Sequence, residues 1–289
     1  MLVQCDAEKN SVDIESIDNH HKELFIILNK LNGLVEQNDE NWEKKQQDAV
    51  LIIKNLFNYS NYHFLNEEEL FIKYSYPETD IHVKKHDRFR KIIKDYLIDI
   101  KTATNLSLDY LQDFLVEWIL EHIQVEDHKY ALYFSRNKIV PELHISEKGR
   151  ERNDILLLWE KKKLSLEIKE IDDQHKELVR ILQQTKDLQY TSENRKQIFG
   201  PLIVKKLYHY ASFHFSYEEE FMAKNKYEAI DEHREWHKVF VADINRLNEE
   251  YENASGVLTE EIVFYLRDWI VDHILKEDKK YKDDIIARN

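Results

Sequence analysis

Apolar residues recur at helical spacing along most of this chain, in eight stretches separated by short polar connections. A period of three to four residues places them on one side of a helix, so the pattern predicts amphipathic helices rather than strands. Long helices with short connections are typical of an up-down bundle. We expect an all-α fold of two such four-helix bundles in tandem, with helices over about 18–37, 41–74, 80–102 and 107–134, then 172–189, 193–224, 230–252 and 259–286.

Composition supports this fold and narrows the class of protein. Four glycines and three prolines in 289 residues leave little material for the tight turns of an all-β fold. The length fits two domains of about 150 residues each. A net charge of −14 argues against binding to nucleic acid or to an anionic membrane surface. No apolar run approaches the roughly 18 residues that span a bilayer.

The N-terminal residues and the cysteine count indicate a compartment. Residues 1–6 lack the basic start and the apolar stretch of a signal peptide. The single cysteine, Cys5, excludes an internal disulfide and is interpreted as a free thiol in a reducing environment. We therefore expect a cytoplasmic protein.

The chain consists of two repeats, each about half of its length. Matching histidines and carboxylates lie 151 positions apart, except for the first histidine of each repeat, where the offset is 154. Repetition at this length indicates two copies of a whole domain rather than a solenoid. We expect domains over 1–138 and 155–289, joined by a linker over 139–154. Pro141 should end the last helix of the first domain, and so short a linker fits a packed or a loosely tethered pair equally well.

Each repeat carries five histidines, one glutamate and one aspartate at matching positions. One ion cannot use seven side chains, so the set predicts two metal ions per repeat. Imidazole and carboxylate ligands without thiolate favour iron or manganese over structural zinc. The predicted metal ligands are His21, His63, Glu67, His82, His86, His122 and Asp127, then His175, His214, Glu218, His233, His237, His273 and Asp278.

Helical spacing predicts where these ligands point. His63 and Glu67 are four residues apart, as are His82 and His86, so each pair shares one face of its helix. A separation of five, as in the fourth helix, turns the second residue by about 140° and should place the two ligands on either side of the core. If five histidines divide three to two and both carboxylates bridge with an oxo or hydroxo group, one metal is closed. The other keeps an open position, where dioxygen would bind.

Four motifs occur in the same order in each repeat: Ile-Asp-x-x-His, His-Phe-x-x-Glu-Glu, His-x-x-x-His and Trp-x-x-x-His-Ile-x-x-x-Asp. The chain resembles the hemerythrin family, in its bacteriohemerythrin group, over nearly its whole length. The resemblance implies a non-haem di-iron centre in each domain, four irons per chain, that binds dioxygen reversibly. It also implies roles for the ligands of the first repeat: His82, His86 and His122 on the closed iron, His21 and His63 on the oxygen-binding iron, and Glu67 and Asp127 as bridges. In the second repeat the same roles fall to His233, His237 and His273, to His175 and His214, and to the bridging Glu218 and Asp278.

The first repeat departs from the family pattern in two places. The tryptophan that often precedes the first helix is matched by Trp159 in the second repeat, and by Cys5 in the first. The glutamine before the first ligand is Gln174 in the second repeat, but His20 in the first, where it competes with His21 as the ligand. We choose His21, because it keeps the three-residue offset from the aspartate of the motif that the second repeat shows.

Apolar residues beside the ligands are candidates for a dry oxygen pocket, which would keep solvent from protonating or displacing the bound molecule. Plain bundle core is an equal interpretation for the leucines, and the isoleucines that follow a metal-binding histidine are the stronger candidates. The set is Leu24, Leu28, Phe64, Trp118, Ile119 and Ile123, then Leu178, Leu182, Phe215, Trp269, Ile270 and Ile274. His128, His144 and His209 have no histidine counterparts and are interpreted as surface or packing residues.

Gly200 and Pro201 interrupt the second helix of the second repeat. Proline inside a helix removes a hydrogen bond and clashes with the preceding turn, at a cost of about 3 kcal/mol. We therefore expect a kink or a new helix start near Pro201, with the ligands on a regular segment beyond it.

Reversible dioxygen binding, for storage, delivery or scavenging, is the favoured function, and the sequence does not identify a protein partner. Oxygen or iron sensing, or iron handling, is an alternative, although the sequence lacks an output domain. A di-iron oxidase, peroxidase or nitric-oxide-handling protein is another, although no acid or base is aimed at a substrate.

Overall fold

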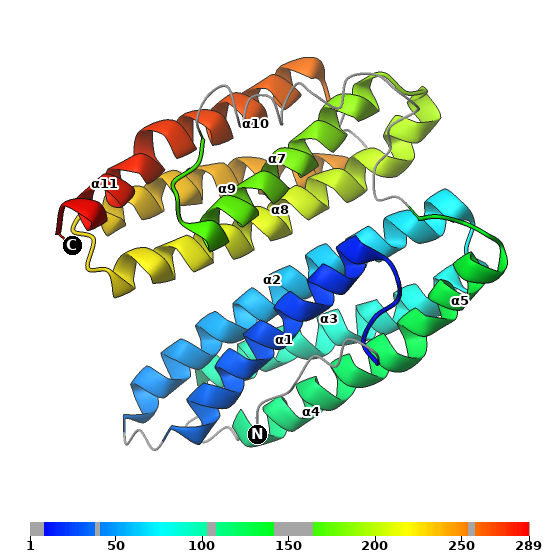
Figure 1. Ribbon diagram of the computed structural model, residues 1–289, viewed down its shortest axis with the longest axis horizontal. Coiled ribbons are helices and arrows are strands. Elements are labelled where there is room, and N and C mark those ends of the chain that lie inside the picture. Colours follow the sequence, from blue (N-terminus) through cyan, green and yellow to red (C-terminus); the bar gives the residue numbers. More distant parts are fainter. Residues whose placement is uncertain (1–8, 38–40, 103–107, 142–163, 254–257, 289) are drawn as a thin grey trace. The chain divides into compact units, whose positions relative to one another are not determined.

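The computed structural model describes residues 9–37, 41–102, 108–141, 164–253 and 258–288. Contacts between Cα atoms divide the chain into two compact units, Met1–Leu143 and His144–Asn289. Each unit is a bundle of helices, and the described residues contain no strand (Figure 1). The prediction of an all-α fold with two helical bundles in tandem is confirmed.

Each bundle has four helices, close to the predicted ranges, and the fourth contains a π-helical segment. The first unit comprises α1 (Glu15–Glu36), α2 (Trp42–Tyr74), α3 (Thr79–Thr102), and then α4 (Leu108–Glu121), η1 (His122–Asp127) and α5 (His128–Arg136) in succession. The second comprises α7 (Lys169–Gln189), α8 (Glu193–Lys224), α9 (Ile230–Glu252), and then α10 (Glu260–His273), η2 (Ile274–Asp278) and α11 (Lys279–Arg288). Helix α1 packs against α2 and α4, and α7 packs against α8 and α10.

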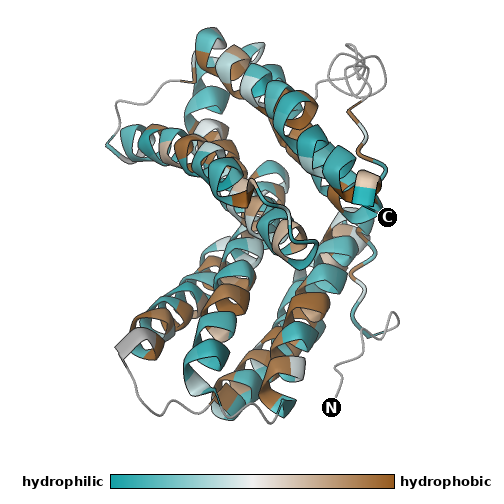
Figure 2. Cartoon of the chain, turned by 90° about the vertical axis from the view of Figure 1, so that its left-hand side faces the viewer, coloured by the Kyte–Doolittle hydropathy of each residue, from teal (hydrophilic) through white to brown (hydrophobic). Residues whose placement is uncertain are grey.

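The apolar stripe of each helix faces the inside of its bundle. Single helices carry both hydrophobic and hydrophilic residues around their circumference (Figure 2). In α1 the residues Leu24, Leu28 and Leu31, spaced by four and then three, are all buried. Removing such a side chain from water contributes about 1.5–3 kcal/mol. The stripe therefore fixes the rotation of α1 and, with it, the direction of the neighbouring His21.

A short loop before the first helix of each bundle is held by one aspartate. The carboxylate of Asp18 accepts hydrogen bonds from the Val12 N–H at 2.8 Å and from the Ser11 hydroxyl at 2.7 Å. Asp13, which follows Val12, has a φ of 58°, in the left-handed region that short polar side chains tolerate. The second bundle repeats the arrangement around Asp172. The loop is therefore fixed against the start of α1, close to the ligands.

The π-helical segments correct one expectation from the sequence. A regular helix would separate His122 from Asp127 by about 140°. Instead, the segment from His122 to Asp127 forms the wider turn in which hydrogen bonds join residues five apart, so both ligands face the core. The His128 ring donates from Nδ1 to the Ile123 carbonyl at 2.9 Å, which supplies that carbonyl with a donor. Segment η2 does the same for the ligands of the second bundle.

Pro201 lies inside α8, which continues from Glu193 to Lys224. A new helix start at this proline is therefore wrong, and a kink stays a prediction. A Cβ atom on Gly200 would come within 3.0 Å of the Tyr251 hydroxyl, so this glycine permits close contact between α8 and α9. Such packing offsets the hydrogen bond that proline removes. The predicted ligands beyond it lie on regular helix.

The last helix of the first bundle ends through its own C-terminal turn. Helix α5 stops at Arg136, and Lys138 has a left-handed φ of 55°. The Ile139 N–H donates to the Phe134 carbonyl at 2.9 Å, the bond that closes a Schellman turn. The helix has therefore ended before Pro141 is reached.

Some predictions fall on residues that the structure does not describe. These are Cys5, His144, Trp159 and positions 142–154 of the predicted linker. Among the described helices, none combines the length and the apolarity that crossing a bilayer requires.

Candidate metal centres

All fourteen predicted ligands lie inside the two bundles, seven in each, and none is more than 5% exposed. In each bundle the first helix contributes one histidine, the second a histidine and the glutamate, the third two histidines, and the fourth a histidine and the aspartate. Side chains from facing helices meet in the bundle core, which is where such folds build metal sites.

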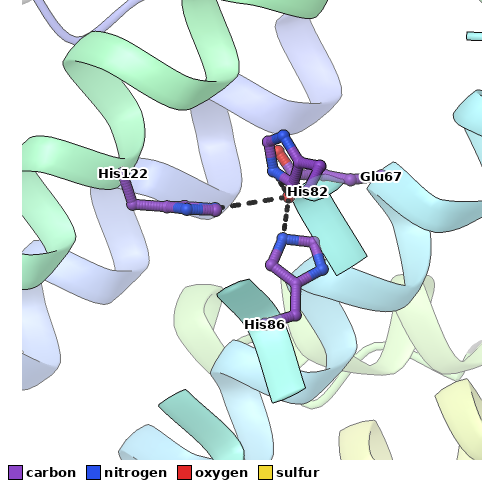
Figure 3. A group of neighbouring side chains, drawn as sticks. All are labelled: Glu67, His82, His86 and His122. Carbon is purple, nitrogen blue, oxygen red and sulfur yellow. Dashed lines mark ion pairs between the residues drawn. The ribbon is translucent and has the colours of Figure 1, made fainter. Parts of the chain in front are cut away.

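The ligands of the first bundle form two groups that share one carboxylate. One group contains Glu67, His82, His86 and His122, whose ligand atoms lie within 4.8 Å of one another. In Figure 3 the three imidazoles of this group point toward the Glu67 carboxylate. The other group contains His21, His63, Glu67 and Asp127. The five histidines thus divide three to two, as the sequence predicts.

Each carboxylate of the first bundle faces both groups with separate oxygens. Oε2 of Glu67 lies 3.1 Å from Nε2 of His86, while Oε1 lies 3.8 Å from Nε2 of His63. Oδ1 of Asp127 lies 3.2 Å from Nε2 of His122, while Oδ2 lies 3.2 Å from Nε2 of His21. Two oxygens turned toward two groups are what a bridging carboxylate requires.

The second bundle repeats the contacts of the aspartate, whereas its glutamate turns Oε2 toward His237 at 3.2 Å and His214 at 3.8 Å, and Oε1 toward His175 at 4.0 Å. Oδ1 of Asp278 lies 3.1 Å from Nε2 of His273 and Oδ2 lies 3.3 Å from Nε2 of His175. Nε2 of His237 lies 3.1 Å from Nε2 of His273, so two ring nitrogens are directed at one point. The groups here are Glu218, His233, His237 and His273, and His175, His214 and Glu218.

The chemistry of these atoms fits metal ions. Within the described part of the first bundle, Nε2 of His63, His82 and His86 and both Asp127 oxygens are buried without a hydrogen-bond partner. Burying one such polar atom costs about 1–3 kcal/mol, and buried polar atoms in proteins are usually satisfied. So many acceptors converging on two points are explained by cations that bind them.

Charges within each cluster shift the pKa values of its members. Burial lowers the pKa of His82, but Asp127 and Glu67 outweigh burial and raise it to about 10. Burial and Glu67 raise the pKa of Asp127, but the histidines around it outweigh them and lower it to about 2. In the second bundle burial lowers the pKa of His214 to about 3, against the pull of Glu218. Carboxylates that stay ionised beside several imidazoles favour a cation between them.

A set of side chains orients the ligands, and sequence reasoning missed it. Nδ1 of His86 lies 2.9 Å from Oε1 of Glu68, whose carboxylate also accepts from Arg90 at 2.9 Å. The second bundle has the same arrangement with Glu219 and His237, also at 2.9 Å. Partners of this kind fix the ring and the tautomer of a metal-binding histidine. The signal was present in the consecutive glutamates that both repeats carry.

The side chains of His20 and His21 lie in different surroundings. His21 belongs to the two-histidine group, and its Nδ1 donates to the Asn10 carbonyl at 3.0 Å. The His20 ring lies instead beside two tyrosines, 5.0 Å from Tyr62 and 6.1 Å from Tyr59 between centroids. His21 therefore stays the predicted ligand, and His20 lies outside the group.

The predicted pocket residues line the ligands in different ways. Phe64 stacks on His86 with ring centroids 4.0 Å apart, and Trp118 stacks on His122 at 4.7 Å. Both aromatic rings therefore stack on the three-histidine group, and Phe64 also lies 5.5 Å from the ring of His63 in the two-histidine group. The remaining candidates of both bundles are buried, each at most 2% exposed: Leu24, Leu28, Ile119, Ile123, Leu178, Leu182, Ile270 and Ile274. Phe215 and Trp269 repeat the stacking on His237 and His273.

A surface cleft of about 300 Å³ in the first bundle and one of about 370 Å³ in the second reach the same histidine position. The first is lined by His122 and Trp118 with the charged Lys85 and Arg88. The second includes Trp236 at the position of Lys85, so its wall is more aromatic. Both clefts reach the three-histidine side of their centre.

Known proteins resemble each bundle separately. The family model described as the hemerythrin HHE cation binding domain matches residues 12–133 and 166–285. A bacteriohemerythrin of Clostridium acetobutylicum is 33% identical over 118 residues, which cover 40% of this chain and 90% of that protein. A bacteriohemerythrin of Stenotrophomonas maltophilia is 28% identical over 123 residues, 42% of this chain and 74% of that protein. A hemerythrin-like protein of Naegleria gruberi is 25% identical over 114 residues, 39% and 79% of the two chains. No solved structure gives a significant match.

Proposed function

Because this chain belongs to the hemerythrin family, we propose that each of its two domains holds a pair of iron ions and binds dioxygen reversibly. The observation that carries the proposal is the sharing of Glu67 between a three-histidine and a two-histidine group, repeated at Glu218. Four groups per chain correspond to four irons, two in each domain. The names of the bacterial relatives support the same assignment.

The two irons of a domain would be held unequally. The three-histidine group would leave its iron closed once both carboxylates and an oxo or hydroxo group bridge the pair. The two-histidine group would leave one position open for dioxygen. A reduced iron pair, when bound, supplies the electrons on which this binding draws. The geometry that supports the bridging roles is the pair of oxygens that Glu67 and Asp127 each turn toward the two groups.

The chain itself contributes orientation and the exclusion of water. Ile123 is fully buried beside its ligand, and Leu24 and Leu28 on α1 are at most 2% exposed. Apolar surroundings raise the free-energy cost of separating charge, so they favour release of neutral dioxygen over its reduction. The Asn10 carbonyl fixes the ring of His21 on the side where dioxygen would bind.

We also propose binding rather than catalysis as the activity, and the cytoplasm as the location. The single cysteine supports a reducing compartment. Two other functions would use the same centres. A protein partner whose binding depends on oxygenation would support a sensor, and sustained dioxygen consumption with a released product would support an oxidase or peroxidase.

Metal and oxygen stoichiometry test the proposal together. The full chain is loaded with Fe²⁺ without oxygen, freed of excess metal, analysed for iron, and titrated with dioxygen. We expect four irons per chain, and up to two dioxygen molecules that are recovered when the oxygen pressure falls. The doubly substituted His86→Ala, His237→Ala chain, which lacks one ligand in each three-histidine group, should take up less of both. Iron without recoverable dioxygen would overturn reversible binding while leaving the metal centres in place.

A further inference from the structure

One ligand of the two-histidine group is supported differently in the two domains. In the second domain Nδ1 of His214 lies 3.0 Å from Oε1 of Gln174, and this contact is buried. An amide oxygen can only accept, so the imidazole donates from Nδ1 and presents Nε2 to the metal. Gln174 precedes the ligand His175 on α7 and thereby positions a second ligand on α8.

The first domain has a different residue at this position. His20 stands where the second domain has Gln174, and its ring centroid lies 5.8 Å from that of His63 at an interplanar angle of 86°. Nδ1 of His63 has no hydrogen-bond partner among the described residues. The neighbouring position differs as well, because Tyr62, which packs against His20, is replaced by Phe213.

Two other contacts around the centres are the same in both domains. His86 and His237, the corresponding ligands of the three-histidine groups, each have a glutamate 2.9 Å from Nδ1. Tyr130 and Tyr281 likewise donate to the same oxygen of their shared glutamates in both domains. These contacts are alike in the two domains, whereas that of His63 and His214 is not.

A hydrogen bond from the outward nitrogen of an imidazole does two things for a metal. It holds the ring in the orientation that binding needs, and it increases the electron density on the nitrogen that binds. Removing a partner of this kind costs about 10–100-fold in metal affinity. Among the described residues, Nδ1 of His63 has no acceptor of this type, and the ring of His20 lies edge-on beside it instead.

We propose that Gln174 is a positioning residue for metal binding, and that the two domains are consequently unequal. The first domain holds the metal of its two-histidine group more weakly than the second domain does. The inference rests on metal binding at both centres, but it does not depend on whether dioxygen is the ligand. In this chain the residue before the first ligand sets the retention of one metal per domain.

Metal release from the full chain tests the inference. The chain is loaded with Fe²⁺ without oxygen and mixed with excess bidentate Fe²⁺ chelator, and the coloured complex is followed over time. We expect about one iron per chain, that of the two-histidine group in the first domain, to leave about 10–100-fold faster than the iron of the same group in the second domain. His20→Gln should abolish this fast phase, and Gln174→His should raise its amplitude to about two irons.

Two further variants separate positioning from mere packing. Gln174→Glu keeps an acceptor for Nδ1 and should keep the slow release, whereas Gln174→Leu should release iron quickly although its volume is similar. Asn19→Asp introduces the residue that the second domain has at the preceding position, and should leave both phases unchanged. Circular dichroism confirms that each variant is folded.

A single release phase in the unsubstituted chain would overturn the inference. So would a folded His20→Gln chain with an unchanged fast phase, or a Gln174→Leu chain that retains iron as well as Gln174→Glu does. Failure of reversible oxygenation would show instead in the dioxygen titration, with iron release unaffected.

Discussion

The hydroxyl of Tyr130 donates a hydrogen bond to Oε1 of Glu67 over 2.8 Å, deep inside the first bundle. Tyr281 makes the corresponding bond to Glu218 at 2.6 Å. Both tyrosines come from the helical segment just beyond the π-turn, so the turn that directs the aspartate inward also directs this hydroxyl. The bond leaves the other oxygen of the glutamate, Oε2, to face the three-histidine group.

Tyr130→Phe should lower the free energy of unfolding of the first domain more than it changes the metal content of that domain. Removing the hydroxyl leaves a buried carboxylate oxygen without its donor, and hydrogen bonds to charged groups contribute about 1.5–3 kcal/mol. Urea unfolding of the metal-free chain should show a loss of this size in the transition of one domain. Tyr133→Phe removes an exposed hydroxyl, 3.3 Å from the Ser75 carbonyl, and serves as the control with a change near zero. Equal effects of the two variants would contradict the role assigned to Tyr130.

Glu67→Gln should reduce the iron content from four to about two per chain. Glu67 belongs to both groups of its domain, and a neutral amide cannot supply the shared negative charge. Elemental analysis after gel filtration measures the loss. Glu68→Gln is the matched control, since its carboxylate contacts His86 and Arg90 and lies outside both groups. It should weaken metal binding about 10–100-fold and keep four irons when Fe²⁺ is saturating. Four irons in Glu67→Gln would show that the carboxylate is not shared.

Ile123→Asn should speed autoxidation of the first site. The side chain of Ile123 is fully buried directly after the ligand His122, and an amide there brings hydrogen-bonding capacity and water to an apolar wall. The decay of the oxygenated spectrum gives the rate, and iron content should stay near normal. Leu132→Asn, at a position 51% exposed, introduces the same amide at the surface and should leave the rate unchanged. If Ile123→Asn also left it unchanged, the oxygen pocket would lie elsewhere.

Metal uptake should release protons. Burial lowers the pKa of His82 and of His233, but their carboxylate neighbours outweigh it and raise the values to about 10 and about 9. Both rings are therefore protonated at neutral pH until a metal displaces the proton, since a bound imidazole is neutral. Apparent affinity should rise with pH below these values, about tenfold per unit for each proton released. Calorimetry in buffers of different ionisation enthalpy counts the protons, and uptake without release would contradict the assignment.

The helices, and the candidate ligand side chains that meet inside each bundle, could be predicted from the sequence because both follow from regular spacing. His63 and Glu67, four residues apart, must share a helical face, and the second repeat confirms that the pattern is not accidental. The apolar stripe of α1 likewise follows from residues three and four apart. These relationships are local, so a single chain carries enough information to fix them.

The π-turns and the outer hydrogen bonds could not be predicted in the same way. A calculation at 3.6 residues per turn places His122 and Asp127 far apart, and only the fold shows that the helix widens there. The partner of an imidazole nitrogen depends on how two helices are rotated against each other. Gln174 and His214 are 40 residues apart, and their spacing in the sequence does not predict the contact.

The most direct test of reversible oxygen binding is the visible absorption spectrum of the iron-loaded chain, recorded under vacuum, under air, and again under vacuum. We predict a colourless reduced protein, a visible band that appears in air, and loss of that band on evacuation with the iron content unchanged over several cycles. A spectrum that air does not alter, or a band that persists after evacuation because the iron has been oxidised, would contradict the account.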